Sequence, residues 1–111
     1  MKLIIAIVQD EDASRLVSSL MKDGFSVTKL ATTGGFLRAG NTTLLLGVDD
    51  EKIRRALDVI EDVCKSRKQV ATAPTSMPGM GNVYGASSYP VEVTVGGATV
   101  FVLPVEQFIK L

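Results

Sequence analysis

The sequence predicts an α+β fold, because one pattern of strand, acidic cluster and amphipathic helix occurs twice in the same order. In each copy an apolar run (LIIAIV from residue 3, TLLLGV from residue 43) precedes the acidic residues and a helically spaced apolar stripe. Two such β-α-β units, joined by a glycine-rich turn, give a split β-α-β, ferredoxin-like sheet with both helices on one face. With 111 residues the chain is long enough for one core, so we predict a single domain over residues 1–111.

The first unit begins with residues 2–9 (KLIIAIVQ), whose continuous apolar run is typical of a strand buried on both faces. Asp10 is the expected N-cap of the following helix, and Gly24 is expected to end it. Three adjacent carboxylates at residues 10–12 also occur in metal sites, but their place before a helix favours capping and an interaction with the helix dipole. The apolar stripe of this helix comprises Ala13, Leu16, Val17, Leu20 and Met21.

Residues 25–33 form the return strand of the first unit, and residues 41–48 form the first strand of the second. We expect these two β-type runs to pair antiparallel. About seven residues join them, whereas a parallel crossover needs a dozen or more. Acidic residues then open a second helix, and a fourth strand is expected around residues 68–75. The stripe of the second helix comprises Ile53, Ala56, Leu57, Ile60, Val63 and Cys64, which makes the only cysteine a core thiol.

A basic run at residues 65–68 (KSRK) has two interpretations. It could contact phosphate, but its position favours the cationic last turn of the second helix, facing the negative pole of the dipole.

Residues 71–90 carry no charge and contain three prolines and three glycines, which predicts a long flexible loop. Its Met and Tyr side chains could pack on a ligand or a partner, or the segment could be a plain surface loop. Residues 91–95 and 98–104 are expected to form an extra C-terminal hairpin around Gly96-Gly97, and the apolar tail beyond it is expected to dock. Extra strands leave edges and a face that need covering, which favours an oligomer.

Composition argues against catalysis. The chain has no histidine, so the commonest general base and metal ligand is absent, and we expect no catalytic residues and no metal. Twelve positive and twelve negative side chains balance, which gives no indication of a nucleic-acid partner or a membrane surface. The apolar run near the N-terminus is too short for a signal peptide, and no run approaches the ~20 residues of a membrane span. We therefore expect a cytoplasmic protein.

The stretch TKLATTGGFLRAGNTTLLLG at residues 28–47 has the chemistry of a binding site. Its glycines could present N–H groups to phosphates, Phe36 could stack on a planar base, and Asn41 could read a base edge. It lacks the GK[ST] ending of a Walker loop. From spacing alone a plain turn with a core phenylalanine stays open beside ligand binding.

Three blocks carry a resemblance: KLIIAIVQDED, TKLATTGGFLRAGNTTLLLGV and YPVEVTVGGATVFVLPVEQF resemble the PII-like cyclic di-AMP receptor proteins of Firmicutes. The resemblance implies a homotrimer of ferredoxin-like subunits with cyclic di-AMP in the clefts between them. It implies a non-catalytic signal transducer with no cofactor besides that ligand, acting on a downstream protein. Residues 71–90 would belong to its long B-loop.

The resemblance also implies the ligand contacts. Asn41 and Thr28, with the Gly47 backbone, would hold one adenine, and Phe36, Leu37 and Phe101 would form an apolar wall for the other. The region of Gly35 would approach the phosphates. The chain departs from the family at Ser26, where an arginine is usual, and at Lys110, where a glutamine is usual. The competing hypotheses are a receptor for another adenine nucleotide such as ATP, a ligand-free interaction module and, more remotely, an enzyme.

Overall fold

β1 (Lys2–Gln9) is a central strand of a four-stranded antiparallel sheet. The computed structural model describes residues 1–30, 40–74 and 88–111. The other strands of this sheet are β2 (Thr28–Leu30), β3 (Asn41–Val48) and β6 (Ala98–Pro104), in the order β2-β3-β1-β6. This order follows the split β-α-β plan, and the mixed α+β class is confirmed.

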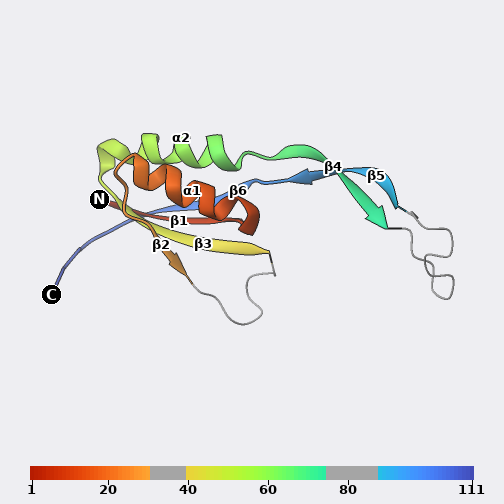
Figure 1. Cartoon of the computed structure of the whole chain (residues 1–111). Helices are drawn as coiled ribbons and strands as arrows, with labels where there is room; N and C mark the ends of the chain where they lie inside the picture. Colours follow the sequence, from red (N-terminus) through yellow and green to blue (C-terminus); the bar gives the residue numbers. More distant parts are fainter. Residues whose placement is uncertain (31–39, 75–87) are drawn as a thin grey trace. The chain divides into compact units, whose positions relative to one another are not determined.

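Both helices cover one face of this sheet (Figure 1). They are α1 (Asp10–Lys22) and α2 (Ile53–Cys64), the latter preceded by a 3₁₀ turn, η1 (Asp50–Lys52). Alternate residues of the central strands point toward the helices, because successive side chains of a strand face opposite ways. The buried core therefore includes Ile4, Ala6 and Val8 of β1, Leu44, Leu46 and Val48 of β3, Leu16 and Leu20 of α1, and Ala56, Ile60 and Cys64 of α2.

The ends of α1 differ in part from the prediction. Gln9 has the extended backbone of the N-cap, and Asp10 is the first helical residue rather than the cap. At the other end Gly24 has φ +89°, as expected for a glycine that ends a helix. The N–H groups of Gly24 and Phe25 donate to the carbonyls of Met21 and Leu20, at 3.0 Å each. The prediction that Met21 belongs to the buried apolar stripe was wrong, because 61% of this residue is exposed.

Asp12 is 1% exposed, although the sequence suggested only a helix-dipole role for it. The Arg15 guanidinium donates to its carboxylate at 3.0 Å and to the carbonyl of Val63 at 3.2 Å. A buried charge needs such a partner, and this one also ties α1 to the end of α2.

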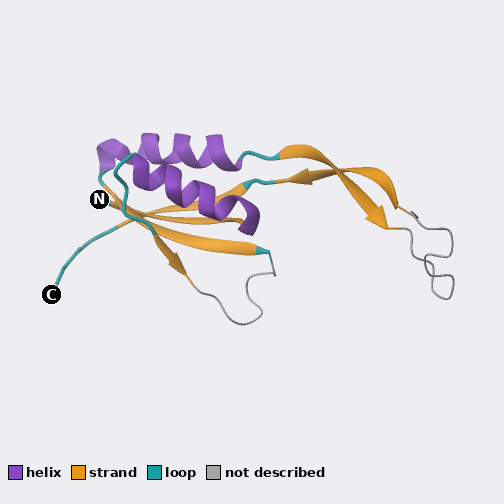
Figure 2. Ribbon diagram, viewed as in Figure 1, coloured by secondary structure: helices purple, strands orange, loops and turns teal. Residues whose placement is uncertain are grey.

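The last three strands pair differently from the prediction (Figure 2). β4 (Arg67–Pro74) forms near the expected residues, but it pairs with β5 (Ser88–Val95) in a separate two-stranded sheet. The predicted hairpin between residues 91–95 and 98–104 is therefore wrong, and β6 takes the fourth place in the main sheet. The apolar β6 forms strand pairs with β1 along its length. By contrast, β4 and β5 are joined by an ion pair between Lys68 and Glu92, whose charged atoms are 3.2 Å apart.

The contacts divide the described chain into two units, residues 1–65 with 96–111, and residues 66–95. The basic run at residues 65–68 does not form the last turn of a helix, because α2 ends at Cys64 and β4 begins at Arg67. Strands also occupy both ends of the stretch predicted as a loop, at 71–74 and 88–90. The remainder of that loop, 75–87, lies outside the described residues.

Candidate functional site

The face of the main sheet that points away from the helices carries apolar side chains from all four strands. The register places Ile5 opposite Leu45 on β3 and Phe101 on β6, and Thr28 of β2 opposite Leu45. Residues opposite one another in a sheet share a face. We call this surface the bare sheet face; its apolar members are Leu3, Ile5, Ile7, Leu30, Leu45, Phe101 and Leu103.

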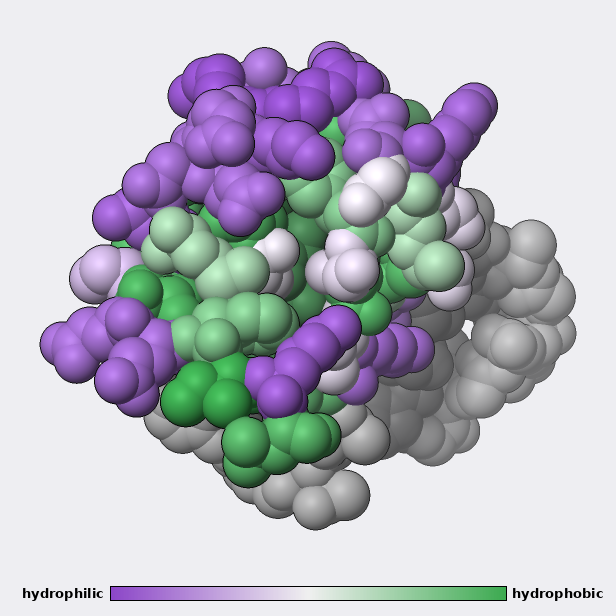
Figure 3. Space-filling model, turned by 90° about the vertical axis from the view of Figure 1, so that its left-hand side faces the viewer, coloured by the Kyte–Doolittle hydropathy of each residue, from purple (hydrophilic) through white to green (hydrophobic). Residues whose placement is uncertain are grey.

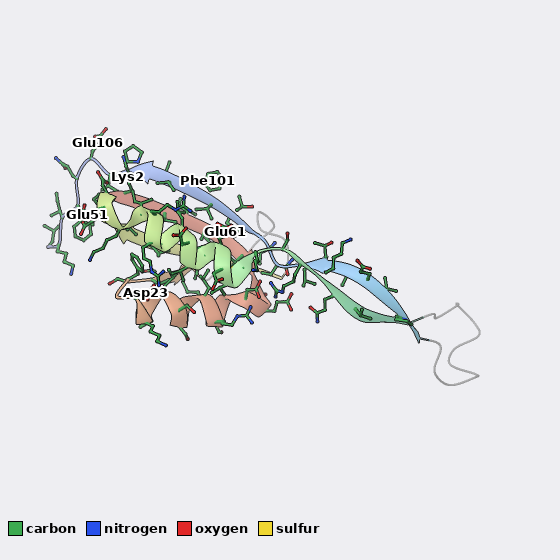
Figure 4. The ribbon with its side chains drawn as sticks, turned by 90° about the horizontal axis from the view of Figure 1, so that it is seen from above. Lys2, Asp23, Glu51, Glu61, Phe101 and Glu106 are labelled. Atoms are coloured by element: carbon green, nitrogen blue, oxygen red, sulfur yellow. The ribbon has the colours of Figure 1, made fainter. Side chains whose placement is uncertain are left out.

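Within the described residues of this unit, no helix covers the bare sheet face. Phe101 is 50% exposed and Leu103 43% exposed. Figure 4 shows Phe101 on β6, with Glu106 beyond the end of that strand. In Figure 3 hydrophilic residues gather over the helices, and hydrophobic residues gather below them around the sheet. On the side seen in Figure 3, apolar surface is therefore exposed around the sheet, with some hydrophilic side chains beside it.

A pocket of about 510 Å³ opens on the bare sheet face. Strand residues form its floor, and the chain after β6 forms part of its wall. Its lining residues are Met1, Leu3, Ser26, Thr28, Leu45, Gly47, Val105, Phe108 and Lys110. The pocket thus combines an apolar floor, an aromatic ring and two hydroxyl groups. This combination suits a flat heterocycle with polar edges.

The charge of this pocket is positive. Lys110 lines it, no side chain that lines it is acidic, and Lys110 has no ion-pair partner among the described residues. A second hollow, of about 590 Å³ between α1 and α2, differs because three acidic residues line it beside its cations: Asp23, Asp58 and Asp62. An available cation beside an apolar floor favours an anionic ligand with an apolar part.

Gly47 leaves room in the pocket for a ligand to approach the backbone. It lies in β3 and is exposed, and a Cβ added there would come no closer than 3.6 Å to the Cε of Met1. Alanine would therefore fit, whereas a long side chain at this position would extend into the pocket.

Asn41 lies at the opposite end of β3, where the backbone is held in place. The N–H of Asp10 donates to the Gly40 carbonyl at 2.8 Å, and the Thr42 hydroxyl donates to the Asp10 carboxylate. The Asn41 side chain shares the bare sheet face and makes no hydrogen bond with the described residues. An amide in this state has both donors and its acceptor available for a ligand.

The structure brings together only some of the predicted contacts. Thr28 and Gly47 line the same pocket, and Phe101 lies on the same face two strands from Leu45. Asn41, however, is six positions before Gly47 on one strand, a separation of about 20 Å at ~3.3 Å per residue. One chain therefore cannot place both on a single adenine, and the predicted roles need a second copy of the chain, as the expected clefts between subunits imply.

The remaining predicted contacts, Gly35, Phe36 and Leu37, lie outside the described residues. Conversely, the structure adds Phe108 of the tail to the pocket. Only the apolar character of the tail suggested that it docks, and no spacing in the sequence pointed to its place beside Thr28. Ser26 and Lys110, identified as departures from a family pattern, both line this pocket.

Two further classes of feature were sought in the described ranges. No helix there combines the length and the apolar character that a membrane crossing requires. No group of three Cys, Asp or Glu residues there is arranged to hold a metal ion.

Comparison with known proteins gives a consistent result. The chain matches the model of the family described as "Cyclic-di-AMP receptor" over residues 1–111. It is also similar to a crystal structure of a functionally unknown protein from Pediococcus pentosaceus ATCC 25745. The two chains are 41% identical, the match covers 99% of this chain and 96% of the other, and the TM-score is 0.75. A family model that matches from the first residue to the last places the whole sequence in one family: the chain belongs to the cyclic-di-AMP receptor family.

Proposed function

We propose that this protein is a non-catalytic receptor that binds cyclic di-AMP between neighbouring copies of the chain in a homotrimer. On binding, its loops change conformation and signal to a downstream protein. The observation that carries this proposal is the pocket on the bare sheet face, which joins Thr28, Gly47 and the cation of Lys110 over an apolar floor. An adenine fits the floor, and a phosphate suits the cation.

The separation of Asn41 from that pocket supports a site shared between copies. Because about 20 Å of β3 lies between Asn41 and Gly47, Asn41 serves an adenine in the pocket only if it comes from a second chain. The exposed Leu30 and Leu103 give that second chain an apolar surface to pack on. In this proposal Phe36, Leu37 and Phe101 form the wall for the second adenine, and the region of Gly35 approaches the phosphates.

Titration calorimetry with cyclic di-AMP, cyclic di-GMP and ATP tests this function. We expect saturable heat with cyclic di-AMP and little with the other two. In a homotrimer with a shared site the stoichiometry is one ligand per chain. Saturable binding of ATP without cyclic di-AMP heat would replace the proposed ligand. No heat with any nucleotide would favour a ligand-free interaction module.

A second prediction concerns Ser26, which lines the pocket where the family usually has an arginine. Ser26→Arg should tighten binding by about 1 kcal/mol or more, because a charge-assisted hydrogen bond to a phosphate is stronger than a neutral one. Ser26→Met is the matched control, since it adds length without charge. Calorimetry at low and high salt separates the two effects, because screening weakens only the charged contact. Equal affinities for wild type and Ser26→Arg would show that the missing charge is unimportant.

A further inference from the structure

The side chain of Gln9 lies on the bare sheet face beside Asn41. Gln9 is the last residue of β1 and pairs with Asn41, the first residue of β3. Directly opposed residues of an antiparallel pair have Cβ atoms about 4.5–5.5 Å apart. Two carboxamides therefore stand next to each other at the end of the sheet where β1 ends and β3 begins.

A hydrogen bond fixes the orientation of the Gln9 amide. The backbone N–H of Gly96 donates to Gln9 Oε1 at 2.8 Å. Since a backbone N–H only donates, the oxygen faces Gly96 and the amide nitrogen faces away from it. The amide NH₂ donates to no group in the described part of the chain.

The backbone around this pair of amides is held in place on both strands. Asp10 follows Gln9 directly, and its N–H donates to the carbonyl of Gly40, the residue before Asn41. The Thr42 hydroxyl, just after Asn41, donates to the carboxylate of the same Asp10. Ordering of this backbone therefore adds little to the entropic cost of binding a ligand here.

We propose that Gln9 is a further ligand-contacting residue, whose NH₂ donates to an acceptor atom of the nucleotide that Asn41 binds. This inference rests on the proposed function. With its oxygen committed to Gly96, Gln9 recognises only acceptors, such as a ring nitrogen or a phosphate oxygen, whereas Asn41 also accepts.

The same geometry gives the contact a second effect. Gly96 directly follows β5, so the amide that contacts the ligand also holds the chain where the 66–95 unit ends. When a ligand orders the Gln9 side chain, the hydrogen bond from Gly96 becomes more persistent. Hydrogen exchange of the Gly96 amide should therefore slow on addition of cyclic di-AMP.

The decisive variant is Gln9→Glu. A glutamate of the same length still accepts the Gly96 N–H, but it has no NH₂ and brings a negative charge toward the phosphates. We expect cyclic di-AMP to bind at least about tenfold more weakly, with an unchanged melting temperature. Gln9→Met also removes the oxygen that accepts the Gly96 N–H. We expect its affinity for cyclic di-AMP to fall by a similar factor, and hydrogen exchange of the Gly96 amide no longer to slow when the ligand is added. Gln69→Glu makes the same chemical change on β4 and should bind like wild type.

The outcomes separate this inference from the function it rests on. If wild type gives no heat with cyclic di-AMP, the proposed function fails and this contact fails with it. If wild type binds and Gln9→Glu binds within about twofold of it, Gln9 only supports the turn at Gly96, and the inference alone is overturned. Weak binding by Gln69→Glu would also overturn the inference. The loss of affinity would then come from the added negative charge wherever it is placed, and not from a contact made by Gln9.

Discussion

Mixed oligomers of Asn41→Ala and Gly47→Met chains should bind cyclic di-AMP at about a quarter of their sites, although neither variant binds alone at the same ligand concentration. Each proposed site takes Asn41 from one copy and the open pocket from its neighbour. In a random mixture about half of the copies supply each intact part, so about one site in four has both.

Each variant removes binding for a different physical reason. An amide that reads an adenine edge contributes about 1–3 kcal/mol, which Asn41→Ala loses. Gly47→Met projects a long side chain from the floor into the pocket, which has a volume of about 510 Å³. Gly47→Ala is the control for the second variant, because a Cβ there makes only an ordinary contact with Met1 at 3.6 Å, and it should bind like wild type.

The measurement is calorimetric stoichiometry after the two chains are dissociated and reassembled together. Light scattering must first show that both variants keep the wild-type mass. A wild-type mass near the 11.8 kDa of a single chain would remove the shared site altogether. If the mass is that of an oligomer but mixing recovers no sites, Asn41 and the pocket act within one chain or not at all.

Leu20→Ala should lower the free energy of unfolding by about 2–5 kcal/mol, whereas Met21→Ala should change it by less than about 0.5 kcal/mol. Leu20 is fully buried in the core, while its neighbour on the same helix is 61% exposed. Truncating a buried side chain loses its transfer free energy and leaves a cavity, and truncating an exposed one does neither. Urea unfolding of both variants with unchanged m-values measures the difference. Equal losses would mean that Met21 is covered in solution, for example by a neighbouring copy.

The sequence predicted the helices well, and the pairing of the last strands less well. Periodicity identifies which residues of one element share a face, so Leu16, Leu20, Ile60 and Cys64 were assigned correctly to the core. Strand pairing depends on which other strand each strand lies beside, and the periodicity of one strand carries no information about its partner. Two glycines before β6 have the signature of a two-residue hairpin, yet β6 pairs with the apolar β1 and β5 pairs with β4.

The candidate site shows the same division. The family resemblance indicated Thr28 and Gly47, and both residues line one pocket. The resemblance did not say which copy of the chain supplies each contact, whereas the length of β3 between Asn41 and Gly47 shows that one chain cannot bring both to the same adenine. Phe108 was missed because the chain beyond β6 has no regular pattern that positions a side chain.

The hydrogen bond from the Gly97 N–H to the Cys64 carbonyl has a consequence for how such a chain diversifies. It holds together the residues just before and just after the 66–95 unit, so the rest of the fold already keeps the two ends of that unit close to each other. The entropy of closing a loop grows only slowly with its length. We therefore expect insertions and deletions between Cys64 and Gly97 to leave the register of the main sheet intact, so a different segment could replace residues 66–95 without a redesign of that sheet.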